Sequence, residues 1–144
     1  RAEAFRAAAE KRAQAVAEHA RAARERVTAS GAAGLPVAVN EMQAPFVKWA
    51  GFRTPVVFGR GEEPGAAEPA ALAGDARKAG VRAVVNNLQS GNPKAAETLA
   101  AELGVPLVTL SNFPGADPDA SSWEAALDAN LDRLLDALKP GGTE

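Results

Sequence analysis

A chain of 144 residues without cysteine is long enough to bury one hydrophobic core, and it has no disulfide framework and no thiolate for a metal site or a nucleophile. It has no tyrosine and a single histidine, His19, so side chains suited to acid–base catalysis are few. The formal net charge of −2 argues against nucleic acid as a partner, because a basic face would be expected for it. No stretch approaches the roughly 20 apolar residues of a transmembrane segment.

The first 30 residues predict a long helix. Residues 2–28 contain eleven alanines and neither Gly nor Pro, which favours helix over seven turns. The larger apolar residues Phe5, Val16 and Val27 are 11 residues apart, a spacing that keeps them near one face. A helix with so few large apolar residues is typical of a strut that packs against another domain, or of a peripheral helix packed by its alanines.

Four short apolar runs, rich in β-branched residues and separated by helical stretches, are typical of buried parallel strands. The predicted strands are residues 36–39, 55–58, 82–86 and 106–110. The predicted helices between and after them are residues 41–50, 69–79 and 93–103, and a last helix capped by Ser121 or Ser122. This alternation predicts an α/β fold, in which a four-stranded parallel sheet has helices on both faces and follows the long Ala-rich helix.

Polar residues follow three of these strands directly. In open α/β sheets, ligands bind in the crevice beyond the carboxyl ends of the strands. We therefore predict a ligand cleft there, and its candidate residues are Asn40, Glu41, Asn87, Ser111 and Asn112. The alternatives are a helix cap at Asn40 and a local turn at Ser111-Asn112.

No motif for catalysis accompanies these residues. Gly59-Arg60-Gly61 lacks the third glycine and the following helix of a dinucleotide site. A nucleophile elbow, a Walker lysine and a zinc-protease His/Glu pair are also missing from the sequence. His19 is expected to be a solvated surface residue, and Trp49 and Trp123 to serve packing. The sequence therefore indicates binding rather than enzymatic activity.

Several short motifs of the sequence occur in the same order and with the same spacing as in a known family. They are Val37-Ala38-Val39-Asn40 with Trp49-Ala50-Gly51-Phe52, then Glu68-Pro69, and then residues 81–87, 94–104, 104–110 and 128–134. In this order the chain resembles the C-terminal lobe of the metal-type, zinc/manganese periplasmic solute-binding proteins of ABC importers, over residues 1–139. The resemblance implies a long interlobe helix at residues 1–30 and a C-terminal α/β lobe at residues 31–144. Because the chain opens without Met at Arg1, we expect a fragment whose N-terminal lobe is absent.

The resemblance also implies that the usual metal ligands are replaced. The family has a His or Glu ligand at the position of Asn40 and usually an acidic residue at Asn87. It has an Asp ligand where this chain has Ser111-Asn112. An amide oxygen is a poor ligand for Zn²⁺, and the loss of acids removes charge that would offset a divalent cation. Glu41, one residue from the ligand position, is the nearby acid that remains.

From the resemblance we expect an extracytoplasmic, lipid-anchored binding component that passes its ligand to an ABC permease. No cofactor is assigned to this lobe. The ligand is a divalent metal (Zn or Mn) bound mainly by the absent lobe, a metal complex, or a small polar organic molecule. The alternatives are a structural or adhesion module whose ligand site has decayed, and a small flavodoxin-like enzyme domain.

Overall fold

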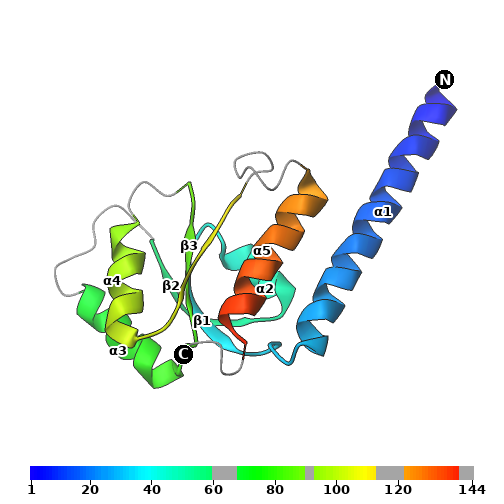
Figure 1. Ribbon diagram of the computed structural model, residues 1–144. Coiled ribbons are helices and arrows are strands. Elements are labelled where there is room, and N and C mark those ends of the chain that lie inside the picture. The colour runs from blue at the N-terminus through cyan, green and yellow to red at the C-terminus, as the bar shows by residue number, and fades with distance from the viewer. Residues whose placement is uncertain (60–67, 90–92, 113–121, 140–144) are drawn as a thin grey trace.

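The computed structural model describes residues 1–59, 68–89, 93–112 and 122–139. At its centre is a four-stranded parallel sheet in the order β2-β1-β3-β4 (Figure 1). The strands are β1 (Pro36–Asn40), β2 (Arg53–Phe58), β3 (Val84–Asn87) and β4 (Leu107–Leu110). The predicted parallel sheet is thereby confirmed.

The helices are α1 (Ala2–Ala29), α2 (Ala44–Ala50), α3 (Glu68–Ala79), α4 (Lys94–Leu103) and α5 (Trp123–Ala137). The N-cap of α5 is Ser122, whose Oγ accepts a hydrogen bond from the Ala125 backbone N at 3.1 Å. Ser122 is therefore the cap, whereas Ser121 lies outside the described residues.

Three elements depart most from their predicted bounds. Strand β2 begins at Arg53 and includes Pro55, which an edge strand tolerates because one side of its backbone needs no ladder hydrogen bonds. Strand β3 begins two residues later than predicted and extends to Asn87. Helix α2 begins at Ala44 rather than residue 41, because residues 41–43 form a turn.

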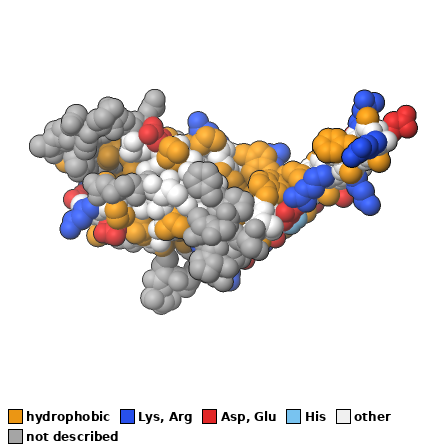
Figure 2. Space-filling view, turned by 90° about the horizontal axis from the view of Figure 1, so that it is seen from above, with side chains coloured by type: hydrophobic (Ala, Val, Ile, Leu, Met, Phe, Trp, Pro, Cys, Tyr) orange, Lys and Arg blue, Asp and Glu red, His pale blue; other side chains and the backbone are white. Residues whose placement is uncertain are grey.

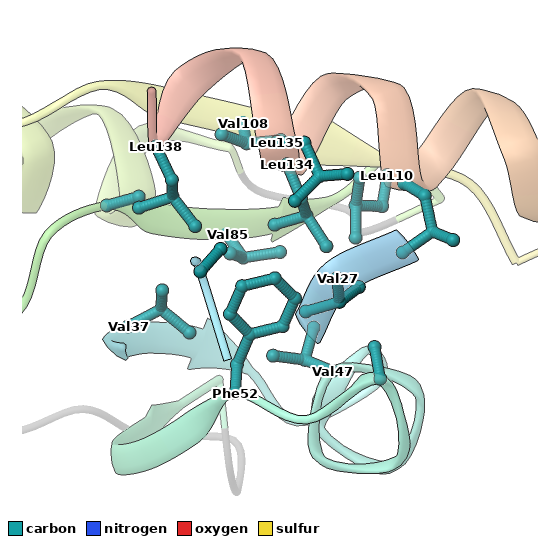
Figure 3. Packing of buried hydrophobic residues seen from close by; sticks show 14 of the residues in the cluster. Val27, Val37, Val47, Phe52, Val85, Val108, Leu110, Leu134, Leu135 and Leu138 are labelled. Carbon is teal, nitrogen blue, oxygen red and sulfur yellow. The ribbon is translucent and has the colours of Figure 1, made fainter. Parts of the chain in front are cut away.

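Each face of the sheet carries its own apolar core, so helices cover both faces as predicted. The first core joins one face to α1, α2 and α5, and includes Val27, Val37, Val47, Phe52, Val85, Leu110 and Leu134 (Figure 3). The second joins the opposite face to α3 and α4, and includes Ala38, Val56, Ala73, Val84, Ala96 and Leu99. Successive strand residues thus alternate between the two cores, as the pleat requires.

Helix α1 is buried only along its C-terminal half. Its buried residues are Ala23 and Val27, whereas every residue from 1 to 15 is exposed. Figure 1 shows its N-terminal half projecting from the body, and Figure 2 shows Lys and Arg side chains along it. The described residues contain no helix long and apolar enough to cross a membrane.

Ion pairs along α5 hold α1 in place. They are Arg12–Glu124 at 2.5 Å and Arg26–Asp132, and between them His19 Nε2 is hydrogen-bonded to Asp128 Oδ1 at 2.9 Å. The His19 ring also meets Trp123 edge-on, with ring centroids 6.2 Å apart. The prediction of a merely solvated histidine is therefore wrong, because its partners come from α5, more than 100 residues away in the sequence.

Candidate functional site

The polar residues of the candidate site gather where β1, β3 and β4 end. Asn40 and Asn87 are the last residues of β1 and β3, and Ser111 directly follows β4. Because the strands are parallel, these three ends lie at the same edge of the sheet. The sequence predicts this placement, and the side-chain contacts determine which residues meet.

Gln43 joins two of the predicted residues. It occupies the N-cap position of α2 and is only 2% exposed. Its Nε2 donates to Asn87 Oδ1 at 2.9 Å and to Asn112 Oδ1 at 2.7 Å. Asn87 and Asn112 therefore meet through a buried third amide, which the candidate list from the sequence does not include.

A second set of hydrogen bonds fixes the chain after β4. Gln89 Nε2 donates to Ser111 Oγ at 3.0 Å, and Gln89 Oε1 accepts from the Asn112 backbone N at 3.0 Å. From α5, the buried Asn130 accepts from the Ser111 backbone N at 3.2 Å and donates through Nδ2 to the Ser111 carbonyl at 2.9 Å. Ser111 and Asn112 are thus positioned by contacts between distant elements, and the alternative of a purely local turn does not describe them.

Asn40 lies apart from this network. Its Oδ1 accepts a hydrogen bond from the Met42 backbone N at 2.9 Å, the geometry of an Asx turn. The alternative of a helix cap at Asn40 is wrong, because the N-cap of α2 is Gln43. The Asn40 amide also lies against Gly59, where an added Cβ would come within 2.8 Å of Asn40 Nδ2.

The pleat explains why Asn40 and Asn87 do not meet. Val39 pairs with Val85, and continuing this register by one residue places Asn40 beside Asn86. Asn40 and Asn86 then share the face covered by α3 and α4, whereas Asn87 is on the opposite face with Gln43. The expectation that Asn40, Asn87 and Asn112 share one focus is therefore wrong for Asn40.

The network carries no formal charge. Its members are the side chains of Gln43, Asn87, Gln89, Ser111, Asn112 and Asn130, all neutral donors and acceptors. Glu41, the nearby acid, is exposed. Within the described ranges, no group of three or more His, Cys, Asp or Glu side chains is placed to hold a metal ion. The described members of the network are suited to hydrogen bonding of a neutral group, and they carry no charge of their own to offset that of a divalent cation.

Two residues missing from the candidate list do have a signal in the sequence. Gln43 stands four residues before Val47, so the helical period places it on the buried face of α2. Asn130 stands four residues before Leu134, on the apolar face of α5. A polar residue at a periodic apolar position indicates a buried hydrogen bond, because an unpaired buried amide is costly.

Comparison with known proteins gives one family and a set of similar folds. The family model described as zinc-uptake complex component A, periplasmic, matches residues 1–137. No curated protein sequence matches the chain.

Three solved structures illustrate the similarity of fold. The solute-binding protein FpvC of Pseudomonas aeruginosa in complex with Mn²⁺ has 22% identity and a TM-score of 0.67, over 90% of this chain and 51% of that one. A Mn-bound periplasmic metal-binding protein of Candidatus Liberibacter asiaticus has 11% identity and a TM-score of 0.66, over 90% and 50%. The laminin-binding adhesin Lmb of Streptococcus agalactiae has 17% identity and a TM-score of 0.66, over 88% and 48%. The chain thus spans about half the length of the structures it matches.

Proposed function

Because this chain belongs to the family of periplasmic zinc-uptake complex component A proteins, we propose that it is the C-terminal lobe of a two-lobed, extracytoplasmic solute-binding protein. In this proposal residues 1–30 are the interlobe helix and residues 31–144 are the lobe. The length of the match supports this division, since the chain spans about half of each similar structure. The projecting half of α1 also supports it, because residues 1–15 are all exposed in this lobe.

The ligand lies at the carboxyl edge of the sheet, in contact with Asn40, Glu41, Ser111 and Asn112, whereas Asn87 supports the site from within the fold. The role of Asn87 is indirect, because its Oδ1 accepts a hydrogen bond from the buried Gln43 and thereby holds Gln43 in place. The observation that carries this proposal is the neutral amide network at the end of a parallel sheet, the usual place for a ligand in such folds.

Neutral residues at this edge give the lobe a distinct part in binding. Zn²⁺ and Mn²⁺ bind best where carboxylates, imidazoles or thiolates offset their charge. This lobe supplies hydrogen bonds instead, so a divalent metal would be held mainly by the other lobe. A metal complex or a small polar organic solute fits an amide-lined edge better. The proposal also includes two further properties: the protein delivers its ligand to an ABC permease, and it is anchored to the membrane through a lipid.

Calorimetric titration of the 144-residue chain with Zn²⁺ and with Mn²⁺ tests the charge argument. We expect a Kd no tighter than about 1 mM, equivalent to roughly −4 kcal/mol. Micromolar binding that is lost in an Asn40→Ala variant would contradict the proposal.

Restoring metal-ligating side chains tests whether the metal site lies at this edge of the sheet. A double variant, Asn40→His with Ser111→Asp, returns the ligand types that the family has at these positions. We expect it to bind Zn²⁺ at least tenfold more tightly than the unchanged chain. A matched control, Lys48→His on the exposed surface of α2, should leave the affinity unchanged. Equal binding by the double variant and the control would place the metal site elsewhere.

A further inference from the structure

Asn86 is a buried amide whose oxygen lacks a hydrogen bond. The residue is 4% exposed, and its Oδ1 is inaccessible and has no donor among the described residues. Leaving a buried acceptor unpaired destabilises a fold, so such atoms are rare in native structures. An unpaired group of this kind calls for a reason beyond the fold.

Asn86 lies at the end of an apolar core. It follows Val84 and Val85 on β3, and Val84 points to the same face, into the core with α3 and α4. An apolar side chain of similar size would extend that core without leaving an unpaired atom. Asn87, the next residue, differs in this respect because its oxygen accepts from Gln43 at 2.9 Å.

The position of Asn86 connects it to the candidate site. By the register of β1 and β3 it stands beside Asn40, on the same face and at the carboxyl edge of the sheet. Neighbouring strands are about 4.8 Å apart, so the two side chains lie side by side, and a solute reaches the Asn86 oxygen only when the groups that cover it move aside. Asn40 Oδ1 already accepts from Met42, whereas Asn86 Oδ1 accepts from no described residue.

We propose that Asn86 is a ligand-binding residue whose Oδ1 accepts a hydrogen bond from an N–H or O–H group of the bound solute, next to Asn40. This inference rests on the proposed function, and it adds a residue and a chemical requirement, namely a hydrogen-bond donor on the solute. Asn86 and Asn87 then have separate roles: Asn86 binds the ligand, and Asn87 stabilises the fold through Gln43.

Stability measurements separate these two roles. In the absence of ligand, Asn86→Val should raise the melting temperature of the chain by about 3 °C, because it removes an unpaired buried acceptor. The matched control, Asn87→Val on the same strand, should lower it, because Gln43 loses its partner. An Asn86→Val chain that is less stable than the unchanged chain would show that the Asn86 oxygen is paired within the fold, by a buried water or a protein group. That result would overturn the proposal.

A charge placed at residue 86 tests whether its side chain faces the ligand. Asn86→Asp puts a carboxylate beside Asn40, so calorimetric titration with Mn²⁺ alone should show at least tenfold tighter binding than the unchanged chain. Asn87→Asp should show no such gain, because residue 87 points to the opposite face. A folded Asn86→Asp chain without any gain would overturn the assignment of Asn86. Failure of the proposed function is distinguishable, since it would appear as micromolar metal binding by the unchanged chain.

Discussion

Replacing Gln43 by Met tests how much the amide network contributes to stability. Met has similar length but cannot donate to Asn87 and Asn112, which accept from Gln43 at 2.9 and 2.7 Å. Asn112 is partly exposed and can bind water instead, whereas Asn87 is buried, so the loss falls mainly on Asn87. An unpaired buried acceptor costs about 1–3 kcal/mol, and we expect the free energy of unfolding to fall by that amount. For a chain of this size the melting temperature should drop by about 4–12 °C.

Urea unfolding followed by far-ultraviolet circular dichroism measures this change. The control is Lys48→Met, on the exposed face of the same helix, which should shift stability by less than about 0.5 kcal/mol. Adding Asn87→Leu to Gln43→Met should cost less than the sum of the two single changes, because both remove the same hydrogen bond. A fall below about 0.5 kcal/mol for Gln43→Met, or strict additivity of the two changes, would refute the reasoning.

Two further predictions concern α5. Asn130→Leu should lower the free energy of unfolding by about 2–4 kcal/mol in urea unfolding, because it removes both hydrogen bonds of Asn130 to the backbone of Ser111; an unchanged midpoint would contradict this. The hydrogen bond and charge of Arg12 hold the pKa of Glu124 below its ordinary value. The pair therefore stabilises the fold fully above the ordinary glutamate pKa, and this contribution is lost as the pH falls through the lowered pKa. Titration by NMR should show the Glu124 pKa rising in an Arg12→Ala variant, and an unchanged value would exclude the pair in solution.

The fold could be predicted from the sequence because each strand is a short run of β-branched apolar residues between helical stretches. Runs such as Val37–Val39 and Val84–Val85 are buried on both faces of the sheet, so their period carries little ambiguity. The boundaries were less predictable. Residues 41–43 are compatible with helix, and a hydrogen bond from the Met42 backbone to Asn40 makes them a turn instead.

The candidate site could be predicted to the level of the sheet edge. Which amides meet depends on the pleat, and a shift of one residue along a strand moves a side chain to the other face. The run Asn86-Asn87 does not reveal which amide shares a face with Asn40, because that depends on the register between β1 and β3. The bonds from Gln43 and Asn130 link residues 69 and 19 positions apart, and no local pattern specifies such partners.

The way α1 is attached has a mechanical consequence. The helix is buried in the first core near one end, at Val27, and toward its N-terminus the described contacts with α5 are the surface contacts of Arg12, His19 and Arg26, which are weak compared with a buried core. At a rise of 1.5 Å per residue, about 37 Å separate Val27 from Ala2. A rotation of 5° about the buried end would therefore move the far tip by about 3 Å. A change in packing around Val27 can be too small to alter the sheet. It would still move the N-terminal tip of α1 by about the length of a hydrogen bond. A small rotation of α1 at its buried end is thus converted into a larger displacement at its N-terminal end.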